Sequence, residues 1–271
     1  MSRKSGRNRG KKAILNILII VCILVLAYSA YRLISYYLAG QQAEKEYANL
    51  RYSPPSSQAA VPQDDQGDYP LRQQHYRELY EQNGDFIGWV KVYGMNVDYP
   101  VMQTPENQDY YLHRNFDKNY SSFGCVFASD GCDVDKPSDV VILYGHKMKN
   151  GSMFGKLSDL EKKDYYDEHQ YIQFDTLKER HSYLIVCIFK TTVDTGSPNE
   201  FKYYDYVDFL DETDFNEFIG TAKEKQVFDT GETIKYGDKL ILLSTCEYTR
   251  RNGRLIVIGK EIPNSEAPAF P

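Results

Sequence analysis

The stretch from Leu242 to Lys260, LLSTCEYTRRNGRLIVIGK, contains two apolar runs separated by a short polar and basic segment. Short apolar runs that are bounded by turn residues are typical of neighbouring strands. Cys246 ends the first run and Arg254 opens the second. The pattern therefore predicts a thiol and a guanidinium at the facing ends of two strands.

Similar apolar runs recur along the chain, and the 24 tyrosines also favour strands over a helical bundle. The predicted strands are residues 86–92, 96–102, 124–129, 139–145, 171–175, 182–190, 239–245 and 254–262. Eight short strands at this spacing indicate a mainly β fold, either a barrel or a sandwich. Helical patterns are added at 71–82, ending at Asn83-Gly84, and at 208–226, between the sixth and seventh strands, where Asp211 or Thr213 is placed to cap the helix.

The N-terminal region has the pattern of a membrane anchor. Residues 1–12 carry six basic residues and no acid, and the segment from Ala13 to Tyr31 has no charged residue. We expect a basic cytoplasmic tail at 1–12 and a transmembrane signal anchor at 13–38, with the C-terminal body outside the cell. A cleaved signal peptide is the alternative, but the apolar stretch is long for one and no convincing cleavage site follows it.

A polar segment with Pro54, Pro55 and Pro62 follows the anchor and predicts a flexible linker at 39–69. The expected folded domain is 70–265, with a short tail at 266–271. The net charge of the whole chain is −6, so removing the six positive charges of the tail leaves −12 on the remainder. A body of that charge is a poor candidate for binding a phosphate backbone.

Three side chains could form a nucleophilic site. Cys246 stands where an apolar strand meets polar sequence, which favours an accessible thiol over a buried one. His146 follows the predicted strand at 139–145 and occupies a comparable strand-end position, so the two can meet although they are 100 residues apart. Arg254 could reach across the hairpin and stabilise a carbonyl oxygen or an oxyanion.

At this point the sequence resembles the class B sortases. The resemblance rests on LSTC (Leu243–Cys246) with the following Arg254, on YGHKMKNGSMFGKL (Tyr144–Leu157), and on IGWVKVYGMNVDYPVMQTPENQDYYLHRNF (Ile87–Phe116). It covers roughly residues 70–263. The resemblance implies an eight-stranded sortase β-barrel with an N-terminal helix and a long helix between strands 6 and 7.

The resemblance also implies a membrane-anchored cysteine transpeptidase on the surface of a Gram-positive bacterium. Cys246 would attack the carbonyl of a Thr in a C-terminal sorting signal and form a thioacyl enzyme. His146 would act as acid and base, and Arg254 would hold the oxyanion. The acceptor would be an amine of a peptidoglycan precursor of the lipid II type, or a pilin lysine. No cofactor, metal or nucleic acid is expected.

Three further positions match residues that contact substrate in the class. They are Ser244, Asn107 and Glu247, and for each a purely structural role is an equal alternative. The segment between Glu247 and Gly253 is short and basic, with Arg250 and Arg251, and we expect it to shape substrate choice.

Several alternatives stay open from the sequence. A papain-like protease and an L,D-transpeptidase are disfavoured because their signature motifs are missing, and a class C sortase is a weaker fit because no Asp-Pro-aromatic lid motif precedes Gly124. A pilin-polymerising sortase and an inactive surface binding domain are the remaining alternatives. Cys125 and Cys132 could form a disulfide, whereas Cys22 and Cys187 lie in apolar segments and are expected to be buried.

Overall fold

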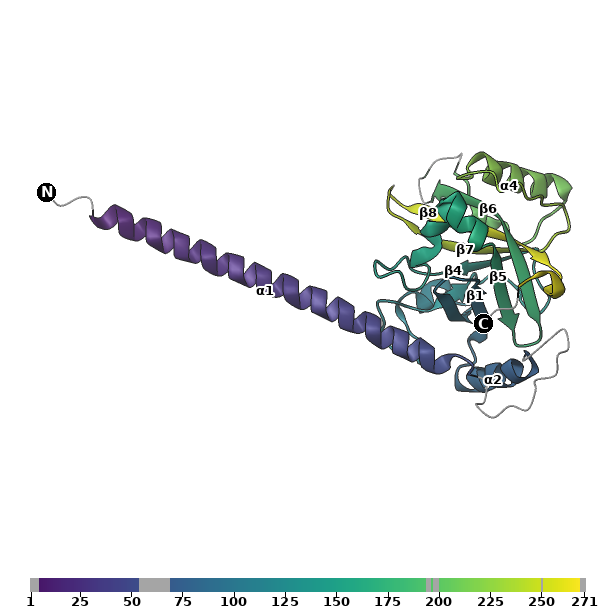
Figure 1. Cartoon of the computed structure of the whole chain (residues 1–271), viewed down its shortest axis with the longest axis horizontal. Coiled ribbons are helices and arrows are strands. Elements are labelled where there is room, and N and C mark those ends of the chain that lie inside the picture. Colours follow the sequence, from purple (N-terminus) through teal and green to yellow (C-terminus); the bar gives the residue numbers. More distant parts are fainter. Residues whose placement is uncertain (1–4, 54–68, 194–195, 197–199, 250, 269–271) are drawn as a thin grey trace. The chain divides into compact units, whose positions relative to one another are not determined.

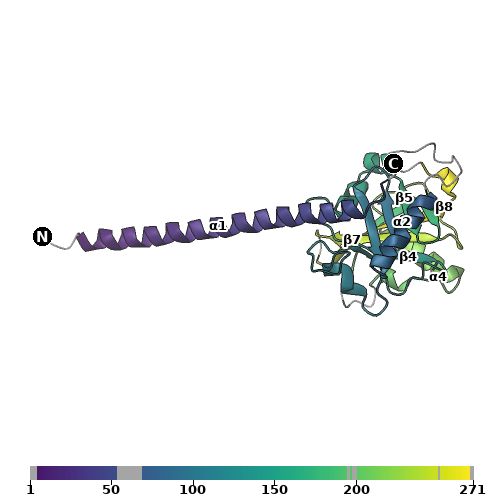
Figure 2. The same ribbon diagram turned by 90° about the horizontal axis from the view of Figure 1, so that it is seen from below.

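The eight apolar runs form a closed barrel in the computed structural model of the chain, which describes residues 5–53, 69–193, 196, 200–249 and 251–268 (Figures 1 and 2). The strands follow one another around the barrel in the order β1-β2-β3-β4-β7-β8-β6-β5. Their bounds are β1 Phe86–Val92, β2 Val97–Met102, β3 Val126–Ala128, β4 Val140–Tyr144, β5 Tyr171–Thr176, β6 Arg180–Thr192, β7 Leu240–Glu247 and β8 Gly253–Ile262. Each expected strand is present, most of them with ends shifted by one or two residues.

Two strand pairs are parallel, and they determine where the long connections go. β2 pairs with β3 and β4 pairs with β7 in parallel, whereas the other neighbours are antiparallel. A parallel partner cannot be reached through a tight turn, so the chain between β4 and β7 has to return to the starting end. That connection contains β5, β6 and α4 (Glu212–Glu224), which the sequence analysis predicted between the sixth and seventh strands.

The helices on the barrel are amphipathic. The apolar face of α4 is buried through Phe215, Phe218 and Ile219, and the Asp211 carboxylate caps its first turn by accepting from the backbone N–H groups of Thr213 (2.8 Å) and Asp214 (3.0 Å). Figure 1 shows α2 (Tyr69–Gln82) and α4 at opposite ends of the barrel. The other helices are α3 (Lys163–Glu168) and the 3₁₀ helices η1 (Gln108–His113), η2 (Gly155–Glu161), η3 (Tyr203–Asp205) and η4 (Asn264–Glu266).

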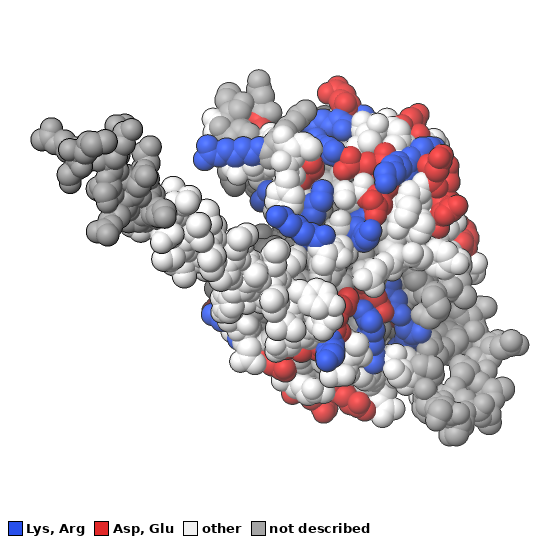
Figure 3. Space-filling view, turned by 60° about the vertical axis from the view of Figure 1, so that its left-hand side comes forward, with Lys and Arg blue, Asp and Glu red and all other residues white. Residues whose placement is uncertain are grey.

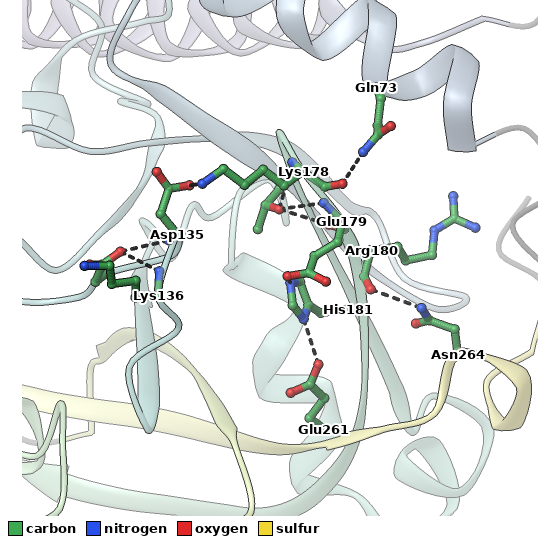
Figure 4. Close-up of polar contacts among 11 residues, drawn as sticks. Gln73, Asp135, Lys136, Lys178, Glu179, Arg180, His181, Glu261 and Asn264 are labelled. Carbon is green, nitrogen blue, oxygen red and sulfur yellow. Dashed lines mark hydrogen bonds and ion pairs between the residues drawn. The ribbon is translucent and has the colours of Figure 1, made fainter.

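Polar contacts attach α2 to the barrel. The buried Tyr76 hydroxyl donates to the carboxylate of Asp175 on β5 at 3.2 Å. Gln73 donates to the carbonyl of Lys178 in the β5–β6 turn (Figure 4). Arg180 forms an ion pair with Asp175 at 3.2 Å. A buried carboxylate needs such partners, so this end of the barrel is held in one arrangement.

The long N-terminal helix α1 runs from Ser5 to Leu50 and contains one segment long and apolar enough to cross a membrane. The chain divides into two compact units, residues 1–44 and 45–271. The helix continues through the first part of the segment expected to be a linker, and residues 54–68 of that segment lie outside the described residues. Tyr47, in the last turn of α1, is buried in the second unit, where its ring packs edge-on against Tyr99 with centroids 5.3 Å apart. The compact unit that holds the barrel thus also includes the end of α1, which lies ahead of the expected start of the domain at residue 70.

Charges of both signs are interspersed over the face of the body seen in Figure 3.

Candidate active site

The three candidate residues come from three adjacent strands. β7 lies between β4, its parallel partner, and β8, its antiparallel partner. Cys246 on β7 is paired directly with Arg254 on β8. On the other side, Tyr144 pairs with Ser244, and His146 lies two residues beyond Tyr144 just as Cys246 lies two beyond Ser244. Paired positions on adjacent strands project to the same face.

Hydrogen bonds extend the β4–β7 pairing beyond the last strand residue. The backbone N–H of Gly145 donates to the carbonyl of Ser244 at 3.1 Å, and the Thr245 hydroxyl donates to the carbonyl of Gly145 at 2.7 Å. The residue that precedes His146 is thereby held beside the residue that precedes Cys246. The sequence prediction that the two strand ends meet is in agreement with this register.

The loop after β4 is closed on itself and fixes the backbone of His146. The N–H of Phe154 donates to the carbonyl of His146 at 3.0 Å, and Lys147 pairs with Met153 in an isolated bridge. A Cβ placed on Gly145 would lie 2.7 Å from the ring of the buried Phe154. Glycine is required here because the Phe154 ring packs directly on the backbone in front of His146.

A cleft of about 430 Å³ contains all three candidates. Its lining comes from η1, β3, the ends of β4, β7 and β8, and the connection between β6 and α4: Gln108, Asp109, Leu112, Phe127, Tyr144, Gly145, His146, Val193, Tyr203, Tyr204, Ser244, Thr245, Cys246 and Arg254. Most of this surface is aromatic or aliphatic, with a few polar groups at one end, as is usual for a site that binds a small extended ligand.

Cys246 differs in its surroundings from the other cysteines of the body. Its side chain is half-buried, between the buried Thr245 and Glu247 on the same strand. Burial raises the pKa of Cys125 to about 12 and that of Cys187 to about 12. Those thiols are packing residues, whereas Cys246 opens into the cleft.

Cys125 and Cys132 are both free and buried, so the disulfide considered from the sequence is not formed. The sulfur of Cys132 accepts from the N–H of Ile142 at 3.3 Å, whereas the sulfur of Cys125 faces the Tyr47 hydroxyl at 3.8 Å. The two sulfurs are engaged with different parts of the fold.

His146 is held by η1. Its Nε2 lies 2.7 Å from the carbonyl oxygen of Leu112. A carbonyl oxygen only accepts, so Nε2 carries a hydrogen and Nδ1 is the nitrogen left to exchange a proton. Burial lowers the pKa of His146; the hydrogen bond to Leu112 acts in the opposite direction without cancelling the effect, and His113 lowers it further. The ring is therefore mostly neutral near pH 7.

Arg254 is half-buried, and its guanidinium Nη1 donates to the carbonyl of Gly253 at 3.1 Å. This contact restrains the side chain at the start of β8, opposite Cys246. Its guanidinium is a planar group of N–H donors, and Arg254 lines the same cleft as Cys246.

The three predicted substrate contacts are placed differently. Ser244 lines the cleft, and its hydroxyl shares a 2.7 Å hydrogen bond with Tyr203, a cleft residue that the sequence analysis missed. Asn107 is exposed at the start of η1, and the cleft lining begins at the next residue, Gln108. The Glu247 carboxylate accepts from the backbone N–H of Thr249 at 3.0 Å and from its hydroxyl at 2.5 Å, so it stabilises its own turn. Arg250, expected to shape substrate choice, lies outside the described residues.

The roles of Tyr203 and His113 could not be read from the sequence. Tyr203 is one of 24 tyrosines, and His113 is one of five histidines and follows no predicted strand, yet its ring stacks on His146 with centroids 5.6 Å apart. A histidine directly after the Tyr-Tyr-Leu segment was the one available hint, and it was too weak to use without the fold.

A closed eight-stranded barrel with cysteine, histidine and arginine at the ends of three adjacent strands defines a cysteine enzyme of the acyl-transfer type. The protein-family model described as the sortase domain matches residues 90–262 of the sequence. The chain therefore belongs to the sortase family. Its relatives place it in class B, and it is a cysteine transpeptidase.

Two curated relatives carry the name Sortase B. The protein from Staphylococcus aureus (strain NCTC 8325 / PS 47) is 27% identical over 257 residues, which cover 93% of this chain and 98% of the relative. The protein from Listeria monocytogenes serovar 1/2a (strain ATCC BAA-679 / EGD-e) is 30% identical over 186 residues, covering 68% of this chain and 72% of the relative. The solved structure of a Staphylococcus aureus sortase B–substrate complex is 25% identical, with a TM-score of 0.69, and the match covers 83% of this chain and 98% of that one.

Proposed function

We propose that this transpeptidase cleaves a C-terminal sorting signal after Thr, through a thioacyl intermediate on Cys246, and transfers the surface protein to an amine of a peptidoglycan precursor. The observation that carries the proposal is the strand register, in which Cys246 has Arg254 as its direct partner on one side and His146 in the corresponding position on the other. A similar sortase B structure is described as a substrate complex, which supports a peptide ligand for this cleft.

In the first half-reaction the thiolate of Cys246 attacks the carbonyl carbon of Thr. Arg254 donates hydrogen bonds to the oxygen as it becomes negative. The C–N bond to the next residue then breaks, and the imidazolium of His146 gives its Nδ1 proton to the leaving amine. A thioester on Cys246 and a neutral imidazole remain.

In the second half-reaction a neutral acceptor amine attacks the thioester carbon. His146 takes the proton from the amine at Nδ1, the C–S bond breaks, and the thiolate and imidazolium are regenerated. Burial lowers the pKa of His146, so the imidazolium that the reaction needs is a minority form near pH 7. We expect a bell-shaped pH–rate profile for this reason.

Ser244 is the proposed substrate contact for which the geometry is favourable, because it lines the cleft two residues before the nucleophile. Asn107 would reach substrate from the start of η1, beside the lining residue Gln108. For Glu247 we propose an indirect role, since its carboxylate holds the turn that follows Cys246.

We further propose that residues 13–38 anchor the enzyme in the cell membrane, with the N-terminus in the cytoplasm and the catalytic body outside. The helix from Ile14 onward is long and apolar enough to span, and six basic residues precede it. A client that carries a sorting signal would meet the cleft at the cell surface.

The test is to incubate the full chain in detergent with a library of sorting-signal peptides and a panel of amines, and to identify products by mass spectrometry. We expect a product cleaved after Thr and joined to the amine, and a trapped acyl enzyme on Cys246. Cys246→Ala and His146→Ala should lose the product, whereas Ser129→Ala, a buried serine that does not line the cleft, is the matched control. Unchanged cleavage by Cys246→Ala would refute the proposal.

A pilin-polymerising activity differs only in the acceptor. The same panel should therefore contain both oligoglycine amines and lysine-containing peptides. Preferential transfer to the lysine ε-amine would assign the enzyme to pilus assembly and would leave the roles of Cys246, His146 and Arg254 intact.

A further inference from the structure

We propose that His113 is a positioning residue for the acid–base chemistry of His146, holding the face of the catalytic imidazole while Leu112 holds its edge. The inference rests on the proposed function, because it assumes that His146 exchanges protons with substrate. His113 is not a catalytic residue in this account, since it acts through the ring it touches.

Two consecutive residues at the end of η1 contact the same ring. The Leu112 carbonyl lies 2.7 Å from Nε2 of His146, and the His113 ring is stacked on the His146 ring with an angle of 27° between planes and 5.6 Å between centroids. Offset stacking at this separation is a favourable arrangement for aromatic rings. The hydrogen bond to Leu112 fixes the direction of the His146 ring within its plane. The stack on His113 limits the tilt of that ring.

The backbone that presents both contacts is itself restrained. The N–H of Ser121 donates to the carbonyl of His113 at 3.0 Å, and Arg114 pairs with Tyr120 in an isolated bridge. On the far side, a Cβ placed on Gly124 would lie 2.5 Å from the Leu112 oxygen, and Gly124 has a φ of +58°. The Leu112 carbonyl is therefore packed against the Gly124 backbone on one side and the His146 ring on the other.

The His113 ring is exposed and lies between Tyr120 and His146, with its centroid 6.3 Å from that of Tyr120. A proton on His113 places a positive charge against His146, and this contact lowers the pKa of His146 in addition to the larger effect of burial. Other charged or titratable groups also line this cleft or adjoin His146 in the chain: Asp109 on η1, Tyr144 on β4, Lys147, Tyr203, Tyr204, Cys246 and Arg254. The His113 ring stacks directly on the His146 ring, so the charge of His113 acts on the pKa of His146 at close range.

The experiment separates the charge of His113 from its ring. His113→Phe keeps an aromatic face and removes the charge, whereas His113→Ala removes both. The full chain, labelled with ¹³C at histidine Cε1 and held in detergent, is titrated by NMR, and the His146 signal is assigned with His146→Gln. The pKa of His146 should rise in both variants because a neighbouring positive charge has been removed.

Activity adds a second readout. His113→Phe should keep kcat within about twofold, whereas His113→Ala should lower kcat/KM by about 2- to 10-fold, the range that corresponds to one aromatic pair. The acidic limb of the pH profile should move to higher pH in both. His169→Phe is the matched control, because His169 is also a ring-stacked histidine, with its ring centroid 3.9 Å from that of Tyr165, and it does not line the cleft.

An unchanged His146 titration in both His113 variants would overturn the proposal. Loss of activity with a large fall in Tm would assign His113 a purely structural role and would also count against it. If instead His146→Gln retains full transpeptidation while the His113 variants still shift the His146 titration, the stack is real and the proposed catalytic role of His146 is wrong.

Discussion

Cys246 and Arg254 face each other across the β7–β8 ladder, one residue before β7 ends and one residue after β8 begins. In an antiparallel pair, directly opposed residues have Cα atoms about 4.5–5.5 Å apart and side chains on the same face. A hairpin thus brings the nucleophile and the proposed oxyanion donor together with little help from the rest of the fold.

Arg254 should contribute mainly to the transition state. Arg254→Ala is expected to lower kcat by about 100-fold or more, the usual loss for one oxyanion donor. Arg254→Lys keeps the charge but loses the planar fork, so it should recover only part of the rate. Steady-state kinetics with a sorting-signal peptide will test this, with Arg77→Lys, at an exposed position of α2 that does not line the cleft, as the control. A change confined to KM would contradict the assignment.

Thiol reactivity should single out Cys246. Of the cysteines after residue 45, Cys125, Cys132 and Cys187 are buried and Cys246 is half-buried. Burial raises the pKa of Cys132 to about 11, and it raises the pKa of the other two buried thiols as well. Brief iodoacetamide treatment of the native protein, followed by peptide mass mapping, should show modification of Cys246 and not of the three buried cysteines. After denaturation, all four cysteines should be modified. Equal labelling of Cys125 in the native state would show that the barrel opens there.

Gly124→Ala should displace the Leu112 carbonyl that holds His146. The added Cβ would lie 2.5 Å from the Leu112 oxygen and 2.6 Å from the Tyr111 oxygen, and the positive φ of 58° disfavours any side chain. The shift of the Leu112 carbonyl would release Nε2 of His146, so we expect a fall in kcat of about 10-fold or more, because small displacements of catalytic groups are costly. Gly84→Ala, where a Cβ meets nothing within 4 Å, should be nearly neutral in the same assay.

The end of α1 should be required for a stable body. Tyr47 is buried and donates to the carbonyl of Gly124, and Glu46 accepts from Asn115 at 2.9 Å. A protein that starts at residue 70 loses a buried aromatic side chain, which costs about 3–5 kcal/mol, and should melt roughly 5–15 °C below one that starts at Lys45. Differential scanning calorimetry decides the point, and equal Tm values would place the domain boundary at residue 70.

Tyr47→Phe is the finer variant. It keeps the ring that packs on Tyr99 but removes the hydroxyl, so the Gly124 carbonyl loses a partner in a buried setting. We expect a loss of about 1–3 kcal/mol in the free energy of unfolding. The full chain carrying this change should still bind substrate.

His181, which does not line the cleft, should make the free energy of unfolding depend on pH. Burial disfavours a charge on this ring, but the hydrogen bond from Nδ1 to Glu261 (2.7 Å) and the charges of Glu261 and Glu179 outweigh it, so the pKa of His181 is raised (Figure 4). A raised pKa contributes stability below the unfolded value of about 6.5, and the contribution is lost as the pH rises through the folded pKa. Glu261→Gln should therefore destabilise more at pH 5.5 than at pH 9 in urea unfolding. An equal effect at both values would exclude this linkage.

The eight strands and both main helices on the barrel could be predicted because their apolar residues alternate or cluster at regular spacing and turn residues bound them. Asp211, offered as a cap of the 208–226 helix, is the cap. The packing of residues 45–50 on the body could not be predicted, because Tyr47 lies in a polar segment that has the composition of a linker, and nothing local indicates the barrel surface that receives its ring. Tyr203, which lines the cleft, and His113, which stacks on His146, were missed for the same reason, since both lie in connections between strands.

The sequence alone determined the class of the enzyme, because each of the segments that resemble class B sortases is a continuous motif. It also determined the hairpin that opposes Cys246 to Arg254, because those two residues are close together in the chain. Only the tertiary structure decided that β4 lies parallel to β7, which brings His146 to the same rim from 100 residues away. It also decided that η1 holds the catalytic ring, through one carbonyl and one stacked imidazole. Contacts of this kind are set by how the barrel closes, and closure depends on the packing of all eight strands at once.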